Sequence, residues 1–83
     1  FKGKHIDLQD SLLSQAQNQG NAITVGEAYQ NDMVMDMGLD IDSTFDILMD
    51  MVVGGILMRT HDYQNQYNQD KEMVAFAVHP DYM

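Results

Sequence analysis

The chain has 83 residues, of which 13 are acidic and four are basic, so its formal net charge at pH 7 is -9. A chain of this length forms one small domain with a thin hydrophobic core, because a domain near this size buries only about 60% of its unfolded surface. The acidic balance argues against binding driven mainly by nucleic-acid phosphates and disfavours anionic membranes. The absence of cysteine excludes disulfides and cysteine zinc sites.

The first predicted element is a helix with Asp7 as its N-terminal cap. Its apolar positions recur at helical spacing and are expected in the core: Leu8, Leu12, Leu13 and Ala16. Gly20 and Asn21 end the helix, because both residue types accept the left-handed backbone of a helix terminus. The β-branched stretch of residues 22–25 then predicts either a small strand or the entry into a second helix.

The second predicted helix runs from about residue 26 to residue 37, and Gly38 follows it as the stop. Its core candidates are Ala28, Tyr29, Met33 and Met37. With the first helix and the helix that follows, it makes three predicted helices before residue 56.

The third predicted helix is capped by Asp40 or Asp42 and ends at the two glycines 54–55. Ser43 and Asp46 resemble a capping pair near its start. Four of its residues follow an i, i+3, i+4, i+7 pattern and are expected to face the core: Thr44, Ile47, Leu48 and Met51.

The last third of the chain has the pattern of two strands, residues 56–61 and 73–78, because apolar side chains alternate along the second of them. We expect these strands to pair as a hairpin that is joined by the polar residues 62–71. The predicted core of the chain draws on all the elements: Leu12, Leu39, Ile47, Leu48, Met51, Ile56, Val74 and Phe76.

This order of helix, short strand, two helices and hairpin resembles the winged helix-turn-helix family. In that family a Gly-Leu turn leads into a recognition helix, which closes with a Gly-apolar-apolar-x-Arg entry into the wing. The chain has Gly38-Leu39 at one end of residues 38–59 and Gly55-Ile56-Leu57-Met58-Arg59 at the other. The resemblance implies an α+β fold, a three-helix winged helix-turn-helix with a C-terminal two-stranded β-hairpin wing, over residues 1–83 as a single domain. A longer second helix and an acidic recognition helix depart from the family.

The outward face of the third helix is predicted to carry two stripes with four-residue spacing. The acidic stripe comprises Asp42, Asp46 and Asp50. The apolar stripe beside it comprises Phe45, Met49 and Val53. A further acidic row is expected along the second helix and its exit: Asp32, Asp36 and Asp40. Aspartates repel phosphates, whereas aromatic and methionine side chains framed by acids are typical of a protein interface.

These stripes predict a non-enzymatic protein-interaction module that binds a basic protein, in particular a nucleic-acid-binding one. Carboxylates about 6 Å apart along a helix are comparable in spacing to neighbouring phosphates on one strand, which leads to the hypothesis of a DNA mimic that inhibits or regulates its partner. The apolar stripe also predicts self-association into a homodimer. An ordinary solvated acidic face is the simpler alternative.

The principal alternative function is that of a DNA-binding winged-helix transcriptional regulator. Its contacts would be Lys2, Lys4, Arg59, His61 and Lys71. A second alternative is that Gly38-Leu39 with Asp42-Ser43 resembles the attachment site of acyl or peptidyl carrier proteins, where Ser43 would bear phosphopantetheine. The carrier pattern keeps its aspartate and serine closer to the glycine than this chain does.

No nucleophile motif, phosphate loop or dinucleotide fingerprint occurs, so neither enzymatic activity nor a cofactor is expected. Asp40, Asp42 and Asp46 are spaced as in a calcium loop, but Phe45 stands at the sharp turn and Met51 at the closing position, so no metal is expected. No apolar run approaches the roughly 20 residues that cross a bilayer. The sequence therefore predicts a cytoplasmic protein with no membrane partner.

Overall fold

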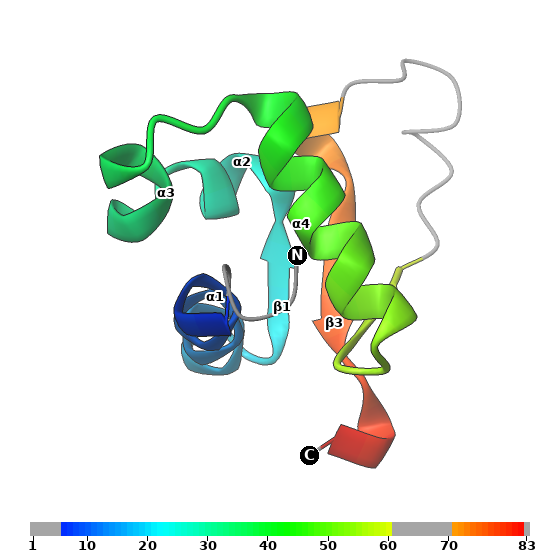
Figure 1. Cartoon of the computed structure of the whole chain (residues 1–83). Coiled ribbons are helices and arrows are strands. Elements are labelled where there is room, and N and C mark those ends of the chain that lie inside the picture. The colour runs from blue at the N-terminus through cyan, green and yellow to red at the C-terminus, as the bar shows by residue number, and fades with distance from the viewer. Residues whose placement is uncertain (1–5, 61–70, 83) are drawn as a thin grey trace.

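The computed structural model describes residues 6–60 and 71–82, which form four α-helices and a three-stranded antiparallel sheet (Figure 1). The elements, with 3-10 turns marked η, are α1 (Ile6–Asn18), β1 (Ala22–Thr24), α2 (Val25–Tyr29), α3 (Asp32–Asp36), α4 (Ile41–Val53), β2 (Leu57–Arg59), η1 (Lys71–Met73), β3 (Ala75–Val78) and η2 (Pro80–Tyr82). The predicted α+β class is confirmed. The predicted connection of residues 62–71 lies outside the described residues except at its last position.

Helix α1 buries the four residues predicted for its apolar stripe: Leu8, Leu12, Leu13 and Ala16. It begins at Ile6, so Asp7 lies in the first turn and the prediction of Asp7 as the cap is wrong. A carboxylate in the first turn still favours the helix, because it lies beside the positive end of the helix dipole. After α1, Gly20 and Asn21 adopt left-handed backbone with φ of 82° and 67°, which confirms the predicted stop.

The predicted second helix is wrong in its extent, because two short helices, α2 and α3, stand in its place. Thr24 starts α2 with a capping box: its hydroxyl accepts a hydrogen bond from the Glu27 backbone N–H at 3.1 Å, and the Glu27 carboxylate accepts one from the Thr24 N–H at 2.9 Å. Asn31 is extended and starts α3, its side-chain oxygen accepting from the N–H groups of Met33 and Val34. These two N–H groups bond to the Asn31 side chain instead of to the carbonyl groups of a continuing helix, so α3 is a separate helix from α2.

The break between α2 and α3 changes which side chains reach the core. Ala28 is buried and Met33 packs against the core as a partly buried side chain, as the sequence predicts. Tyr29 and Met37 are 40% and 45% exposed, so their assignment to the core is wrong. Val34 is fully buried in their place, since the restart at Asn31 shifts the helical phase.

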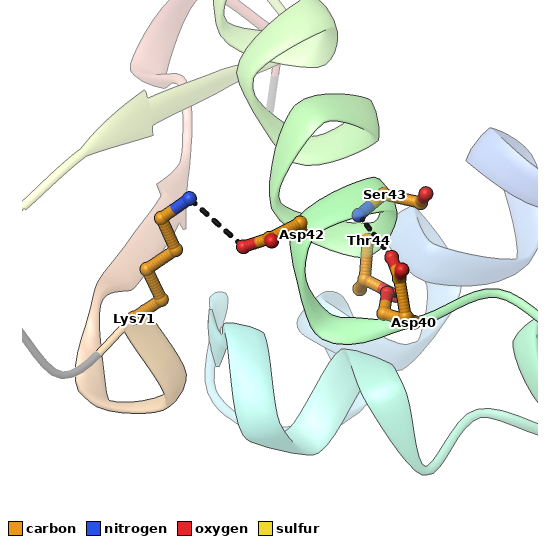
Figure 2. Close-up of polar contacts among 5 residues, drawn as sticks. All are labelled: Asp40, Asp42, Ser43, Thr44 and Lys71. Atoms are coloured by element: carbon orange, nitrogen blue, oxygen red, sulfur yellow. Dashed lines mark hydrogen bonds and ion pairs between the residues drawn. The ribbon is translucent and has the colours of Figure 1, made fainter.

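Asp40 caps the N-terminus of α4, and its carboxylate accepts a hydrogen bond from the Ser43 backbone N–H at 2.8 Å (Figure 2). This contact decides between Asp40 and Asp42 as the cap, and it shows that the predicted capping pair of Ser43 and Asp46 is wrong. The helix ends at the predicted glycines 54–55. All four residues predicted to face the core are buried: Thr44, Ile47, Leu48 and Met51.

Strand β3 is the middle strand of the sheet, because the order is β1-β3-β2 and both neighbours run antiparallel to it. Phe76 of β3 pairs with Ile23 of β1 on one side and with Arg59 of β2 on the other. The predicted pairing of the last two strands is confirmed, although β3 begins later than predicted because residues 71–73 form a 3-10 turn. Residues 22–25 provide both elements left open by the sequence, a strand and then the start of α2.

The hydrophobic core is built from the helices and from alternate residues of the strands, as the strand burial patterns show. Its largest fully buried side chains include Phe76, Leu8, Leu12, Ile23, Leu48, Met51 and Leu57. Of the predicted core residues, Leu39 and Ile56 are half-buried and pack against this cluster, and the other six are buried. None of the helices in the described part of the chain is long and apolar enough to span a membrane.

We predict that Leu48→Ala lowers the free energy of unfolding by about 2 to 5 kcal/mol, because it leaves a cavity where α4 packs on the core. Leu48 is 0% exposed. The control is Val53→Ala on the same helix, where the side chain is 84% exposed, and it should change the free energy by about 0.5 kcal/mol or less. Urea unfolding followed by circular dichroism measures both variants, and equal losses would contradict the burial of Leu48.

The Asp40 cap predicts a loss of stability in acid. Hydrogen bonds from Ser43, first from its backbone N–H and then from its side chain, hold the pKa of Asp40 below its ordinary value of 3.8. The carboxylate therefore contributes stability above pH 3.8, and the contribution is lost as the pH falls through the folded pKa. Asp40→Asn keeps a capping oxygen that does not titrate, so the melting temperature of this variant should fall less steeply with acid than that of the wild type.

Candidate protein-interaction surface

The outer face of α4 carries the predicted acidic stripe. Asp42, Asp46 and Asp50 are all exposed, and they stand four residues apart on one continuous helix. A rise of about 1.5 Å per residue places successive members about 6 Å apart along the axis. The three predicted carboxylates therefore lie exposed along one side of α4.

One end of the acidic stripe meets a cation. Lys71 Nζ of η1 lies 2.9 Å from Asp42 Oδ1, 29 residues away along the chain (Figure 2). The hydrogen bond to Asp42 raises the pKa of Lys71, and the charges of Asp42 and, to a smaller extent, Asp46 raise it further. Both side chains are largely exposed, so the pair fixes the position of Lys71 more than it stabilises the fold.

The predicted apolar stripe is not continuous on the surface. Phe45 and Met49 are partly buried and pack against the core, whereas Val53 is 84% exposed. The ring of Phe45 lies 6.3 Å from that of Phe76, centroid to centroid, in a tilted arrangement. The prediction of an exposed stripe is therefore wrong at Phe45 and Met49, which are partly buried, and self-association through this stripe stays a prediction.

Two cations of the described residues lie over the partly buried Phe45 ring. The guanidinium of Arg59 and the ammonium of Lys71 lie 5.7 Å and 5.2 Å from the ring centroid. Such cation–π contacts are favourable because the face of an aromatic ring is electronegative. The position of Arg59 follows from the sheet, where Arg59 pairs with Phe76 and so shares its face.

The structure thus brings together parts of two predicted sets. Asp42 and Phe45 belong to the predicted protein-interaction residues, and Arg59 and Lys71 belong to the alternative nucleic-acid contacts. The other three of those alternative contacts, Lys2, Lys4 and His61, lie outside the described residues. The sequence gives one local indication that Phe45 is partly buried. Phe45 lies three residues before the buried Leu48, so the two side chains are neighbours on the helix surface.

The predicted acidic row along the second helix is interrupted. Asp32 and Asp36 are exposed on α3, but Asp40 is the cap of α4 and its carboxylate is bonded to Ser43. The two helices have separate axes because α3 ends before the turn at Gly38, which has a φ of 68°. The regular spacing of the three acids therefore ends at Asp36.

The fold of the last third of the chain differs from the fold that the carrier-protein resemblance implies. That resemblance implies a final helix, whereas the last third of the chain contributes strands β2 and β3. Ser43 lies in the first turn of α4 and donates its N–H to Asp40. Within the described part of the chain, no three His, Asp or Glu side chains are placed together as metal ligands.

No protein-family model matches the chain, and neither the curated proteins nor the solved structures contain a significant match.

We predict that Asp42→Asn lowers the pKa of Lys71 toward its ordinary value of 10.5, because the largest cause of the raised pKa is the hydrogen bond to Asp42. A raised pKa means that the pair contributes stability below pH 10.5, which is lost as the pH rises through the folded pKa. NMR titration of the Lys71 side chain measures the change. Asp50→Asn, which leaves this bond intact, is the control and should leave the pKa of Lys71 nearly unchanged.

Proposed function

We propose that this domain is a non-enzymatic protein-interaction module of the winged helix-turn-helix type. It binds a basic, nucleic-acid-binding protein through the outer face of α4, where its carboxylates take the place of DNA phosphates. Occupation of the partner's DNA-binding surface would inhibit or regulate that partner. The interaction takes place in the cytoplasm.

The order of elements supports the winged-helix part of the proposal. A helix and a short strand precede the remaining helices, and the last two strands form an antiparallel pair beside β1. Helix α2 packs against α4, which occupies the place of the recognition helix in the resemblance. The division of the second helix into α2 and α3 is a departure from that family.

The observation that carries the functional proposal is the uncompensated charge of the outer α4 face. Asp46 and Asp50 form no ion pair among the described residues, and Asp42 pairs with Lys71. Cationic side chains of a partner could therefore meet two carboxylates that have no ion-pair partner in residues 6–60 and 71–82, with the spacing that a helix imposes. Such complementary charge accelerates association and selects partners of the opposite sign.

The same geometry disfavours direct binding of DNA. Lys71 is held by Asp42, and Arg59 lies over the Phe45 ring, so both described Lys and Arg side chains already have partners within the domain. A phosphate that approached them would also approach the acidic stripe. Repulsion between the two anions opposes the electrostatic term that supplies most non-specific affinity for DNA.

The proposal predicts that Asp46→Asn with Asp50→Asn weakens binding to a basic DNA-binding protein about threefold or more, because exposed ion pairs contribute modestly. Asp42 is left unchanged, since its replacement would release Lys71. The probe is a complex of purified core histones with a fluorescent DNA duplex, and displacement of the duplex is followed by anisotropy. We expect the wild-type domain to displace the duplex, less effectively as salt is added.

The matched control is Asp7→Asn with Asp10→Asn, which removes the same charge from exposed positions of α1. This control should compete nearly as well as the wild type. Equal losses in the two double variants would reduce the effect to net charge and overturn the assignment to α4. Tight, salt-sensitive binding of the domain to the free duplex, lost on Arg59→Ala, would establish the DNA-binding function instead.

A further inference from the structure

The two edges of the three-stranded sheet are formed by β1 and β2, because β3 lies between them. In an antiparallel pair, an edge strand bonds to its neighbour through every second residue, and the backbone N–H and C=O groups of the residues between point away from the sheet. The hydrogen bonds of the sheet identify these outward residues on both edges. What the outward groups meet differs between β1 and β2.

The edge of β1 is occupied by side chains of the domain itself. The residue before β1 and the residue after it both bond to β3, which directs the backbone groups of Ala22 and Thr24 away from β3. The C=O of Ala22 accepts a hydrogen bond from the Gln19 side-chain amide at 3.2 Å, and the N–H of Thr24 donates to the Glu27 carboxylate at 2.9 Å. A strand added at this edge would have to displace both side chains.

The edge of β2 is open within the described part of the chain. Strand β2 is bonded to β3 through the residues that flank it, since the C=O of Ile56 accepts at 2.9 Å and the N–H of Thr60 donates at 3.0 Å. The same alternation directs the backbone groups of Leu57 and Arg59 away from β3. These outward groups form no hydrogen bond within residues 6–60 and 71–82. They are donors and acceptors in the arrangement that an extended strand complements.

The side chains of this edge contain no acid, although the whole chain has a net charge of -9. Leu57 is buried, Arg59 is a cation, and Met58 is 42% exposed on the opposite face of the strand. Most of the acidic surface repels a second copy of the chain, whereas β2 brings no carboxylate to such an approach. The edge of β2 is therefore a place where two copies can meet.

We propose that two copies of this domain associate by antiparallel pairing of their β2 strands about a two-fold axis at Met58. Leu57 of each copy then lies opposite Arg59 of the other, and each such pair exchanges two N–H···O hydrogen bonds. Met58 lies opposite Met58 of the other copy in a non-hydrogen-bonded pair, where side chains approach most closely. The pairing makes one continuous sheet across both copies and leaves the aspartates of α4 unused.

Charge and backbone conformation select this register. A two-fold axis at Arg59 would place two guanidinium groups directly opposite each other, which is destabilising. An axis at Leu57 would place Arg59 opposite Gly55, whose φ of 79° is outside the extended region. Pairing at Met58 avoids both. Because it uses the same edge of both copies, it is closed and stops at a dimer.

The first test places like charges at the axis. In sedimentation equilibrium, the wild-type domain should form a reversible dimer. Met58→Lys should raise the dimer Kd about tenfold or more, because two ammonium groups would lie opposite each other. Met35→Lys makes the same change of charge at a methionine of α3 that is 63% exposed, and it should leave the Kd nearly unchanged.

The second test blocks the backbone of the edge. Arg59→Pro removes an outward N–H and places the proline ring at the edge, while the bonds from β2 to β3 remain, since the Arg59 N–H does not face β3. The dimer Kd should rise about tenfold or more. Arg59→Ala removes the guanidinium and keeps the N–H, so this control should still dimerise. Circular dichroism verifies that each variant is folded.

Amide hydrogen exchange locates the interface directly. Protection of the Leu57 and Arg59 N–H groups should increase with protein concentration as the dimer forms. A wild-type domain that stays monomeric up to about 1 mM would overturn the proposal. A dimer that survives both Met58→Lys and Arg59→Pro, or that leaves the two amides unprotected, would also overturn it.

This inference does not rest on the proposed function, and the two fail separately. Asp46→Asn with Asp50→Asn leaves β2 unchanged and should still dimerise. Failure of the competition with histone-bound DNA would therefore leave the dimer standing. A monomeric wild-type domain would reject the pairing of β2 and leave the competition to be judged by its own variants.

Discussion

The hydrophobic core that α4 shares with the middle strand of the sheet, β3, is the interaction on which the rest of the structure depends. Phe76 of β3 is fully buried, and it pairs with both outer strands, so its position links β1, β2 and the core. On α4, Leu48 and Met51 contribute fully buried side chains to the same core. Because one side of a regular helix is committed to this contact, the opposite side must face solvent, and that side carries the acidic stripe.

Phe45 lies at the boundary between these two sides of α4 and connects the core with the surface charges. Its ring contacts Phe76 and supports Arg59 and Lys71, and Lys71 in turn meets Asp42. Two of the few cations of a strongly acidic chain are thus held near one end of the stripe. At the remainder of the stripe, Asp46 and Asp50 form no ion pair within residues 6–60 and 71–82.

The outer face of α4 offers three exposed carboxylates and one exposed apolar residue, Val53. Recognition proposed for this face is therefore mainly electrostatic, and it should weaken as salt screens the charges.

The sequence by itself determined the buried faces and the C-terminal ends of the two longest helices, which depend on neighbours within about four positions. Periodicity identified the buried faces of α1 and α4, and Gly20 and the glycines 54–55 ended those helices as predicted. Only the tertiary structure decided the surroundings of Phe45, because Lys71 and Phe76 reach it from across the fold. The break between α2 and α3 likewise involves tertiary contacts, because the Asn31 side-chain amide donates hydrogen bonds to Ser11 and Gln15 of α1, at 3.2 Å and 2.8 Å.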